Sequence, residues 1–218
     1  MKQSQVCRSL AVVAAVAGTL GLAAAASAAP TDGWSQSGWS YQVHKPYNVS
    51  LGSRFTYSGG VWTTWVNRTD AAFQSGSTTG ARTELRWLND YTSGQRMWSG
   101  DVYVVSGSTG VSIAQIFGAS GRSTATMVHA NSASGGSLRL YGEAGRTIAT
   151  GVYNRWLNLK MAHDANANVI RMYINNALIR TDADHGNGTH YFKNGVYAQG
   201  GASSRMEARF RSLQQWRR

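Results

Sequence analysis

Short runs with a strand-like pattern recur along this chain of 218 residues from residue 41 onward. Connectors rich in Gly, Ser, Asn and Asp separate these runs, and no segment after residue 28 keeps a helical period for long. Many short strands at this spacing predict an all-β fold, a single-domain sandwich or jelly roll of two antiparallel sheets. We expect strands at residues 41–44, 61–66, 83–87, 100–105, 111–117, 124–129, 137–141, 156–163, 169–174, 177–180, 190–199 and 206–216.

Two polar turns interrupt this pattern. Residues 164–168 alternate oxygen ligands as calcium loops do, but the following Gly and the distant Glu of such loops are missing, so a hairpin turn is the better interpretation. Asn175 and Asn176 also indicate a tight turn, because Asn tolerates positive φ.

The first 28 residues have the pattern of a secretory signal peptide. Lys2 and Arg8 precede an uncharged run over residues 9–25, and Ala-Ser-Ala at 26–28 offers small residues for cleavage. A membrane anchor is the weaker alternative, because glycines interrupt an alanine-rich run. We therefore expect a secreted, extracellular protein with one folded domain over residues 29–218, and no membrane association after the leader is removed.

The mature chain is strongly basic. Removing Lys2 and Arg8 from the 21 basic residues leaves 19 against 10 acidic residues, a formal charge of +9. This excess favours polyanionic partners through long-range attraction. Nucleic acid, acidic polysaccharide and the anionic cell envelope all fit, and a solvated basic surface with no specific partner is a further alternative. The single cysteine, Cys7, lies in the leader, so no disulfide is expected.

Three segments sort their polar side chains onto one face of a predicted strand. They are Arg-Thr-Glu-Leu-Arg (82–86), Gln-Ile-Phe (115–117) and Tyr-Phe-Lys-Asn-Gly-Val-Tyr-Ala-Gln (191–199). Alternate side chains of a strand point to opposite faces. The polar face therefore carries Arg82, Glu84, Arg86, Gln115, Tyr191, Lys193, Tyr197 and Gln199 over an apolar underside that includes Leu85, Ile116 and Val196. Such a face suits a site for an acidic polymer.

A polymer of 4-linked uronic acids can be cut by β-elimination, which uses no water. A base removes the proton at C5, an acid assists the departure of O4, and negative charge develops on the carboxylate group. Arg82 and Gln115 supply a fixed cationic fork and a neutral donor for that charge. Tyr197, four residues from Lys193 on the same face, supplies a phenol that can give and accept a proton. Each residue alone also fits ordinary packing or ion pairing, so the prediction rests on their combination.

In this order, the three segments resemble the signature strands of polysaccharide lyase family 7, the alginate lyases, and of relatives such as the family 20 glucuronan lyases. The similarity extends over most of the mature chain. It implies a β-jelly roll with a long concave groove, in which Arg82 and Gln115 neutralise the uronate carboxylate and Tyr197 is the catalytic acid. It also implies groove-shaping or sugar-binding roles for Glu84, Arg86, Tyr191, Lys193 and Gln199.

Phe117 departs from the family pattern, in which the second segment ends in a His that is assigned as base or carboxylate ligand. Gln-Ile-Phe-Gly (115–118), together with Val-His-Lys-Pro-Tyr (43–47), also resembles the secreted plant proteins described as citrate-binding. The identity of the base therefore stays open between Tyr197 alone, His44 and His129.

We expect a secreted lyase that cleaves an acidic polyuronate, glucuronan or alginate, as a monomer without cofactor or metal. The alternative is a non-catalytic binding protein for acidic sugars or small carboxylates that uses Arg82, Arg86 and Lys193. Nucleic acid is not the expected partner, because the short motifs of that class are missing from the sequence. Hydrolysis by paired carboxylates is also disfavoured, since Glu84 and Glu207 each lie between arginines that keep them ionised.

Overall fold

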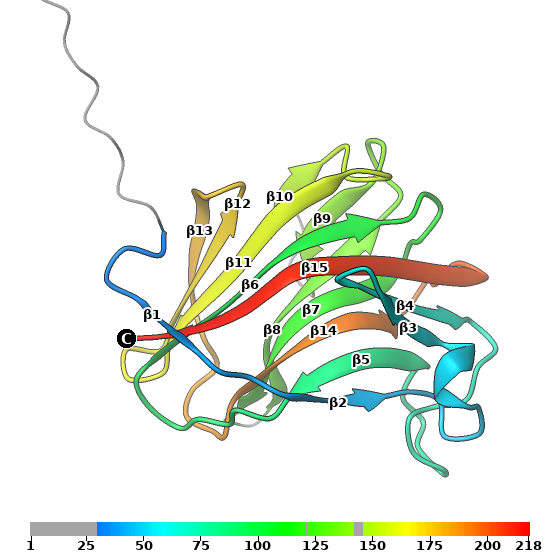
Figure 1. Ribbon diagram of the computed structural model, residues 1–218, viewed down its shortest axis with the longest axis horizontal. Helices are drawn as coiled ribbons and strands as arrows, with labels where there is room; N and C mark the ends of the chain where they lie inside the picture. The colour runs from blue at the N-terminus through cyan, green and yellow to red at the C-terminus, as the bar shows by residue number, and fades with distance from the viewer. Residues whose placement is uncertain (1–29, 121, 142–145) are drawn as a thin grey trace, which may run out of the picture.

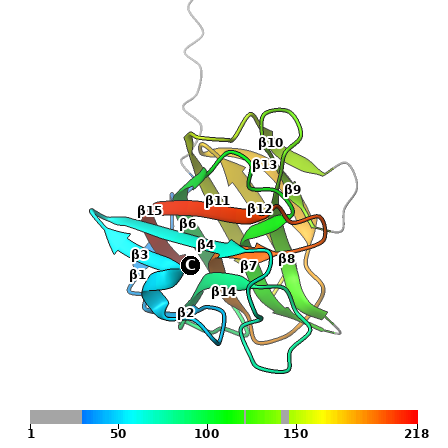
Figure 2. The same ribbon diagram turned by 90° about the vertical axis from the view of Figure 1, so that its right-hand side faces the viewer.

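The computed structural model describes residues 30–120, 122–141 and 146–218, so the predicted signal peptide lies outside the described residues. These residues form two antiparallel sheets that pack face to face (Figure 1 and Figure 2). The all-β jelly-roll prediction is thereby confirmed. Within the described ranges, no helix has the length and apolar character needed to cross a membrane.

The elements follow one another along the chain as β1 (Ser35–Ser37), β2 (Tyr41–His44), the short 3-10 helix η1 (Leu51–Ser53), β3 (Phe55–Ser58), β4 (Val61–Asn67), β5 (Arg82–Trp87), β6 (Gln95–Val104), β7 (Val111–Ala119), β8 (Arg122–Asn131), β9 (Ser137–Leu140), β10 (Thr147–Thr150), β11 (Trp156–Asp164), β12 (Val169–Ile174), β13 (Ala177–Ala183), β14 (Tyr191–Ala198) and β15 (Arg205–Arg217).

The strand order brings distant parts of the sequence side by side. Among the described residues, one sheet has eight strands in the order β13-β12-β11-β6-β15-β4-β3, with β1 paired to the end of β15. The other has seven strands in the order β10-β9-β8-β7-β14-β5-β2. The three segments singled out in the sequence therefore lie on the adjacent strands β5, β14 and β7.

All twelve predicted strands are present, and the structure adds β1, β3 and β10. β1 has the polar sequence Ser-Gln-Ser, and it is a strand because it pairs with β15, with Ser35 opposite Arg217. The hairpin at residues 164–168 is also confirmed, because Asp164 pairs with Val169 across it. The second turn has φ values of 48° and 69° at its two asparagines, 175 and 176.

The core lies between the two sheets and collects the inward-facing side chains of most strands. Leu85, Ile116 and Val196 are completely buried there, as the alternation predicted. Burial of each such side chain contributes about 1.5–3 kcal/mol. Thr83 donates a hydrogen bond of 3.0 Å to the carbonyl of Trp65, which ties β5 to β4 of the opposite sheet. The polar residues that alternate with these core residues consequently lie on the outer face of the seven-stranded sheet.

Candidate functional site

A pocket of about 220 Å³ lies on the outer face of the seven-stranded sheet. Its lining includes Arg82 from β5, Gln115 from β7 and Tyr197 from β14. The strand register explains this convergence, because Tyr197 is opposite Arg82 and Lys193 is opposite both Gln115 and Arg86. The structure thus brings together the three residues to which the sequence assigned the chemistry.

The guanidinium of Arg82 lies over the ring of Tyr197, with 3.8 Å between its central carbon and the ring centroid. This is a cation–π arrangement, which holds a flat cation against an aromatic face. The Arg82 side chain is 12% exposed, so it is partly withdrawn from water. Charge interactions are stronger in such a setting than in bulk solvent. A positive group and a phenol therefore share one side of the pocket.

Glu84 lies beneath the pocket, at 1% exposure, rather than on its surface. Its Oε1 accepts a 2.5 Å hydrogen bond from Nε2 of Gln115. Its Oε2 lies 3.6 Å from Nη1 of Arg82 and 3.6 Å from Nζ of Lys193. A buried carboxylate needs such partners to offset its loss of hydration. Glu84 is thus placed to fix the Gln115 amide and to hold Arg82 in the pocket lining and Lys193 beneath it.

Lys193 is almost as buried as Glu84, at 2% exposure. Burial lowers the pKa of Lys193 from its usual value, and the charge of Glu84 opposes that shift. Its Nζ lies 5.0 Å from the ring centroid of Phe117 and 5.8 Å from that of Tyr191. The ammonium therefore contributes positive potential from below the pocket.

Phe117 lines the pocket and stacks on Tyr191 with 4.7 Å between the ring centroids. The guanidinium of Arg86 lies on Tyr191 as well, 3.9 Å from its centroid, and pairs with Asp90 at 2.6 Å. Burial raises the pKa of Tyr191, which keeps its phenol neutral. The pocket is therefore lined by the phenyl ring of Phe117 at the position where the family resemblance implies an imidazole.

His44 belongs to β2 and lies opposite Glu84, so it shares the outer face of the sheet. Its ring stacks on Phe73 with 4.1 Å between the centroids. Burial, followed by the charges of Lys193, Arg82 and Arg86, lowers the pKa of His44 to about 4. The imidazole is consequently neutral at neutral pH.

His129 belongs to β8. Across the sheet it pairs with Ser112 of β7, which in turn pairs with Tyr197 of β14. Burial lowers the pKa of His129 to about 4. The described residues that line the 220 Å³ pocket include Tyr197 but neither His129 nor His44.

Gln199 directly follows β14 and lines a second pocket of about 470 Å³. Arg68 also lines it, and the two pockets share Thr79 and Tyr197, so they adjoin at Tyr197. Sequence reasoning missed the part that the connection between β4 and β5 plays in both pockets. The available signal was a Gly-, Ser- and Thr-rich stretch at residues 75–80, immediately before the first of the three segments.

Known proteins match this chain over most of its length. The family model described as alginate lyase matches residues 35–215. A citrate-binding protein of Hevea brasiliensis is 35% identical over 192 residues, which cover 86% of this chain and 79% of that protein. The predicted resemblance to both groups is confirmed.

Solved structures show the same fold. An alginate lyase of Pseudomonas aeruginosa matches with a TM-score of 0.64 at 14% identity, covering 82% of this chain and 98% of that one. A marine family 7 alginate lyase of Zobellia galactanivorans matches with a TM-score of 0.63 at 18% identity, covering 85% and 95%. The family match spans β5, β7 and β14, which carry Arg82, Gln115 and Tyr197, and the chain therefore belongs to the alginate lyase family.

Proposed function

We propose that this protein is a polysaccharide lyase that cleaves a polyuronate, glucuronan or alginate, by β-elimination. The observation that carries the proposal is the single pocket lined by Arg82, Gln115 and Tyr197. These three side chains supply a cation, a neutral donor and a proton carrier, which are the groups that β-elimination next to a carboxylate needs.

Arg82 and Gln115 bind the uronate carboxylate. As the C5 proton leaves, negative charge spreads onto that carboxylate, and donors already in place stabilise it without reorganisation. Glu84 keeps one N–H of the Gln115 amide occupied from below, so the amide has a fixed orientation. Lys193 adds positive potential from beneath, 3.6 Å from the Glu84 carboxylate.

Tyr197 moves the proton. Its phenolate takes the proton from C5, the C4–O4 bond breaks as the C4–C5 double bond forms, and the resulting phenol gives the same proton to O4. One group suffices when the C5 proton and O4 lie on the same side of the sugar ring. We assign both steps to Tyr197 because it lines the pocket together with Arg82, whereas His44 and His129 lie outside that lining.

The polymer extends beyond one sugar. The pocket that adjoins at Tyr197 offers Arg68 and Gln199 to a neighbouring residue of the chain. The basic excess of the mature sequence attracts a polyanion over long distances. We infer that the protein acts as a monomer outside the cell after removal of residues 1–28, and that it uses no cofactor for this reaction.

A second function has specific support, namely binding of acidic sugars or small carboxylates without catalysis. Phe117 stands where the family resemblance implies an imidazole, and the Hevea relative is named for citrate binding. Arg82, Arg86 and Lys193 would then serve as the anion site.

A panel of polyuronates separates the two functions. The mature protein is incubated with glucuronan, polymannuronate, polyguluronate and pectate across a range of pH, and absorbance of the unsaturated product is followed. Product from at least one polymer, lost in Arg82→Ala but kept in Arg209→Ala on the opposite sheet, supports the lyase. Citrate binding that depends on Arg82, with no product from any polymer at any pH, supports the binding protein instead.

A further inference from the structure

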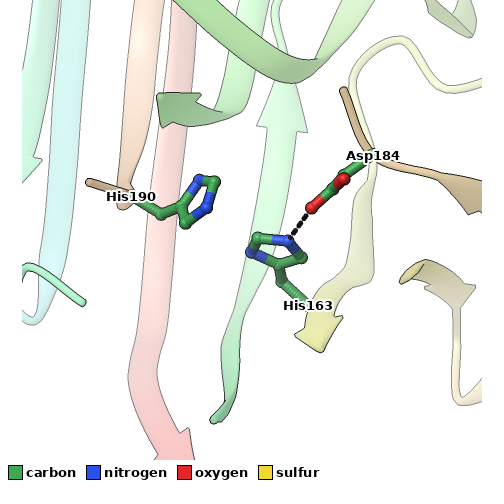
Figure 3. Close-up of side chains that lie close together, drawn as sticks. All are labelled: His163, Asp184 and His190. Atoms are coloured by element: carbon green, nitrogen blue, oxygen red, sulfur yellow. Dashed lines mark hydrogen bonds and ion pairs between the residues drawn. The ribbon is translucent and has the colours of Figure 1, made fainter. Parts of the chain in front are cut away.

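Three side chains of types that can bind metals lie close together in the core, on the side of the seven-stranded sheet away from the pocket. His163 lies near the end of β11, Asp184 directly follows β13, and His190 directly precedes β14. One candidate ligand atom from each lies within 4.8 Å of the other two, and all three residues are buried. Figure 3 shows the two imidazoles and the carboxylate pointing toward one another.

The second nitrogen of each imidazole is held by a group outside the trio. Nδ1 of His190 donates to the carbonyl of Gly118 at 2.8 Å, and Nδ1 of His163 lies 2.8 Å from the hydroxyl of Tyr91. Metal-binding histidines are fixed in this way, with the other ring nitrogen hydrogen-bonded to a neighbouring group. Both Nε2 atoms are thereby left for the centre of the trio, where that of His163 lies 2.7 Å from Oδ2 of Asp184.

The charge balance of the trio also favours a cation. The ion-pair partner of Asp184 among the described residues is His163, and both side chains are fully buried. A buried carboxylate needs positive charge or hydrogen bonds to offset its loss of hydration, and a bound cation supplies the charge.

We propose that Nε2 of His163, Nε2 of His190 and a carboxylate oxygen of Asp184 form a structural Zn²⁺ site. Two imidazole nitrogens and one carboxylate oxygen are a ligand set that zinc accepts, with a fourth position for water. In the metal-bound form, Nδ1–H of His163 donates to the Tyr91 oxygen while Nε2 binds the metal. The sequence suggested no such site, because the ligands come from three separate segments without a recognised ligand spacing.

The location of the trio indicates what the metal does. β11 belongs to the eight-stranded sheet, whereas His190 leads into β14 of the seven-stranded sheet. A shared ion joins the two sheets at one end of the sandwich and so stabilises the fold. The reaction pocket lies on the other face of β14, so the metal takes no part in the elimination, and the proposal is independent of the proposed activity.

Zinc content and thermal unfolding test the site directly. Untagged mature protein is stripped with a chelator, reloaded with Zn²⁺ and desalted, and bound zinc is measured by mass spectrometry. We expect one zinc per chain and a rise in Tm of about 5–10 °C when free zinc is near 100 times its Kd. His163→Gln and His190→Gln should lose both effects, whereas the control His129→Gln, which removes a buried imidazole of the outer face, should keep both.

Measurements on the wild-type protein alone test the metal site even when a variant does not fold. Loading it with Co²⁺ in place of Zn²⁺ should give one equivalent of cobalt with the visible absorption of a site with nitrogen and oxygen ligands. Stripped wild-type protein that takes up neither metal and keeps the same Tm would show that the trio is a hydrogen-bonded core cluster only. Folded variants that bind zinc as the wild type does would place the metal elsewhere and also overturn the proposal.

Discussion

Glu84 on β5 accepts a hydrogen bond from Gln115 on β7 across the strand β14 that lies between them. The β14 residue opposite Glu84 is Gly195. Its φ is +149°, and an added Cβ would lie 2.2 Å from the carbonyl oxygen of Thr83 and 2.6 Å from Cα of Glu84. The close approach of β14 to β5 at Glu84, the hydrogen-bond partner of Gln115, therefore depends on a glycine in the middle of the sheet.

Gly195→Ala should damage both the fold and the site. The added Cβ meets backbone atoms of β5, so β5 and β14 must separate, at a cost of at least about 2 kcal/mol. Urea denaturation measures the loss in the free energy of unfolding. Gly38→Ala is the matched control, since an added Cβ there meets nothing within 4 Å. Equal stability of the two variants would contradict this dependence.

Glu84→Gln should destabilise the protein far more than Asp90→Asn. The first change removes the anion that compensates Lys193 at 2% exposure, which costs about 3 kcal/mol. The second removes the partner of Arg86, but that carboxylate side chain is 39% exposed, so we expect less than about 1 kcal/mol. Chemical denaturation of both variants at neutral pH makes the comparison. Similar costs would mean that Glu84 does not hold the buried cations.

His129 should make the protein sensitive to mild acid. Its pKa is about 4 in the folded protein against 6.5 when unfolded, so the unfolded state binds a proton first as the pH falls. The contribution of His129 to stability should be constant above about pH 6.5 and should fall by up to about 3 kcal/mol between pH 6.5 and 4. The lowered pKa of His44 likewise makes stability fall as the pH falls.

Denaturation of the wild type and His129→Gln as a function of pH isolates this contribution. The difference in the free energy of unfolding between the two proteins should change between pH 6.5 and 4 and stay constant above pH 6.5. Parallel curves from pH 4 to 8 would rule out a proton-linked cost at His129.

Phe117→His should place an imidazole beside Gln115 in the pocket. Because the ordinary pKa of His is about 6.5, the new group can act as a base near neutrality. We expect the pH optimum to move toward neutral pH, or the range of accepted uronates to widen. Rates on the four polymers across pH measure both, with Phe117→Leu as the control for the lost ring. A profile identical to that of Phe117→Leu would mean that the imidazole does not reach the substrate.

The faces of the site strands followed from sequence because the period of two is a local property. Leu85, Ile116 and Val196 are buried, and Arg82 and Tyr197 meet on the other face, as alternation predicts. The pairing of β14 with both β5 and β7 is not local. That these three strands lie side by side could be expected only from the resemblance of the three segments to one family.

Features that depend on tertiary packing were not predictable in the same way. Glu84 belongs to the polar face by alternation, yet its burial depends on Gly195 opposite it and on the cations that surround it. The approach of His163 to His190 depends on how the two sheets face each other. No pattern along a single strand carries that information.

Tyr197→Phe tests the central claim, that one phenol carries the proton of the elimination. Its matched control is Tyr103→Phe, because the ring of Tyr103 lies under Arg209 on the opposite sheet, with 5.4 Å between guanidinium carbon and centroid. Both variants should fold like the wild type, as thermal unfolding can verify. On whichever polyuronate the wild type cleaves, Tyr197→Phe should lower turnover by roughly 10²–10⁴ while Tyr103→Phe leaves it unchanged. A folded Tyr197→Phe variant that forms unsaturated product at the wild-type rate would contradict the assignment.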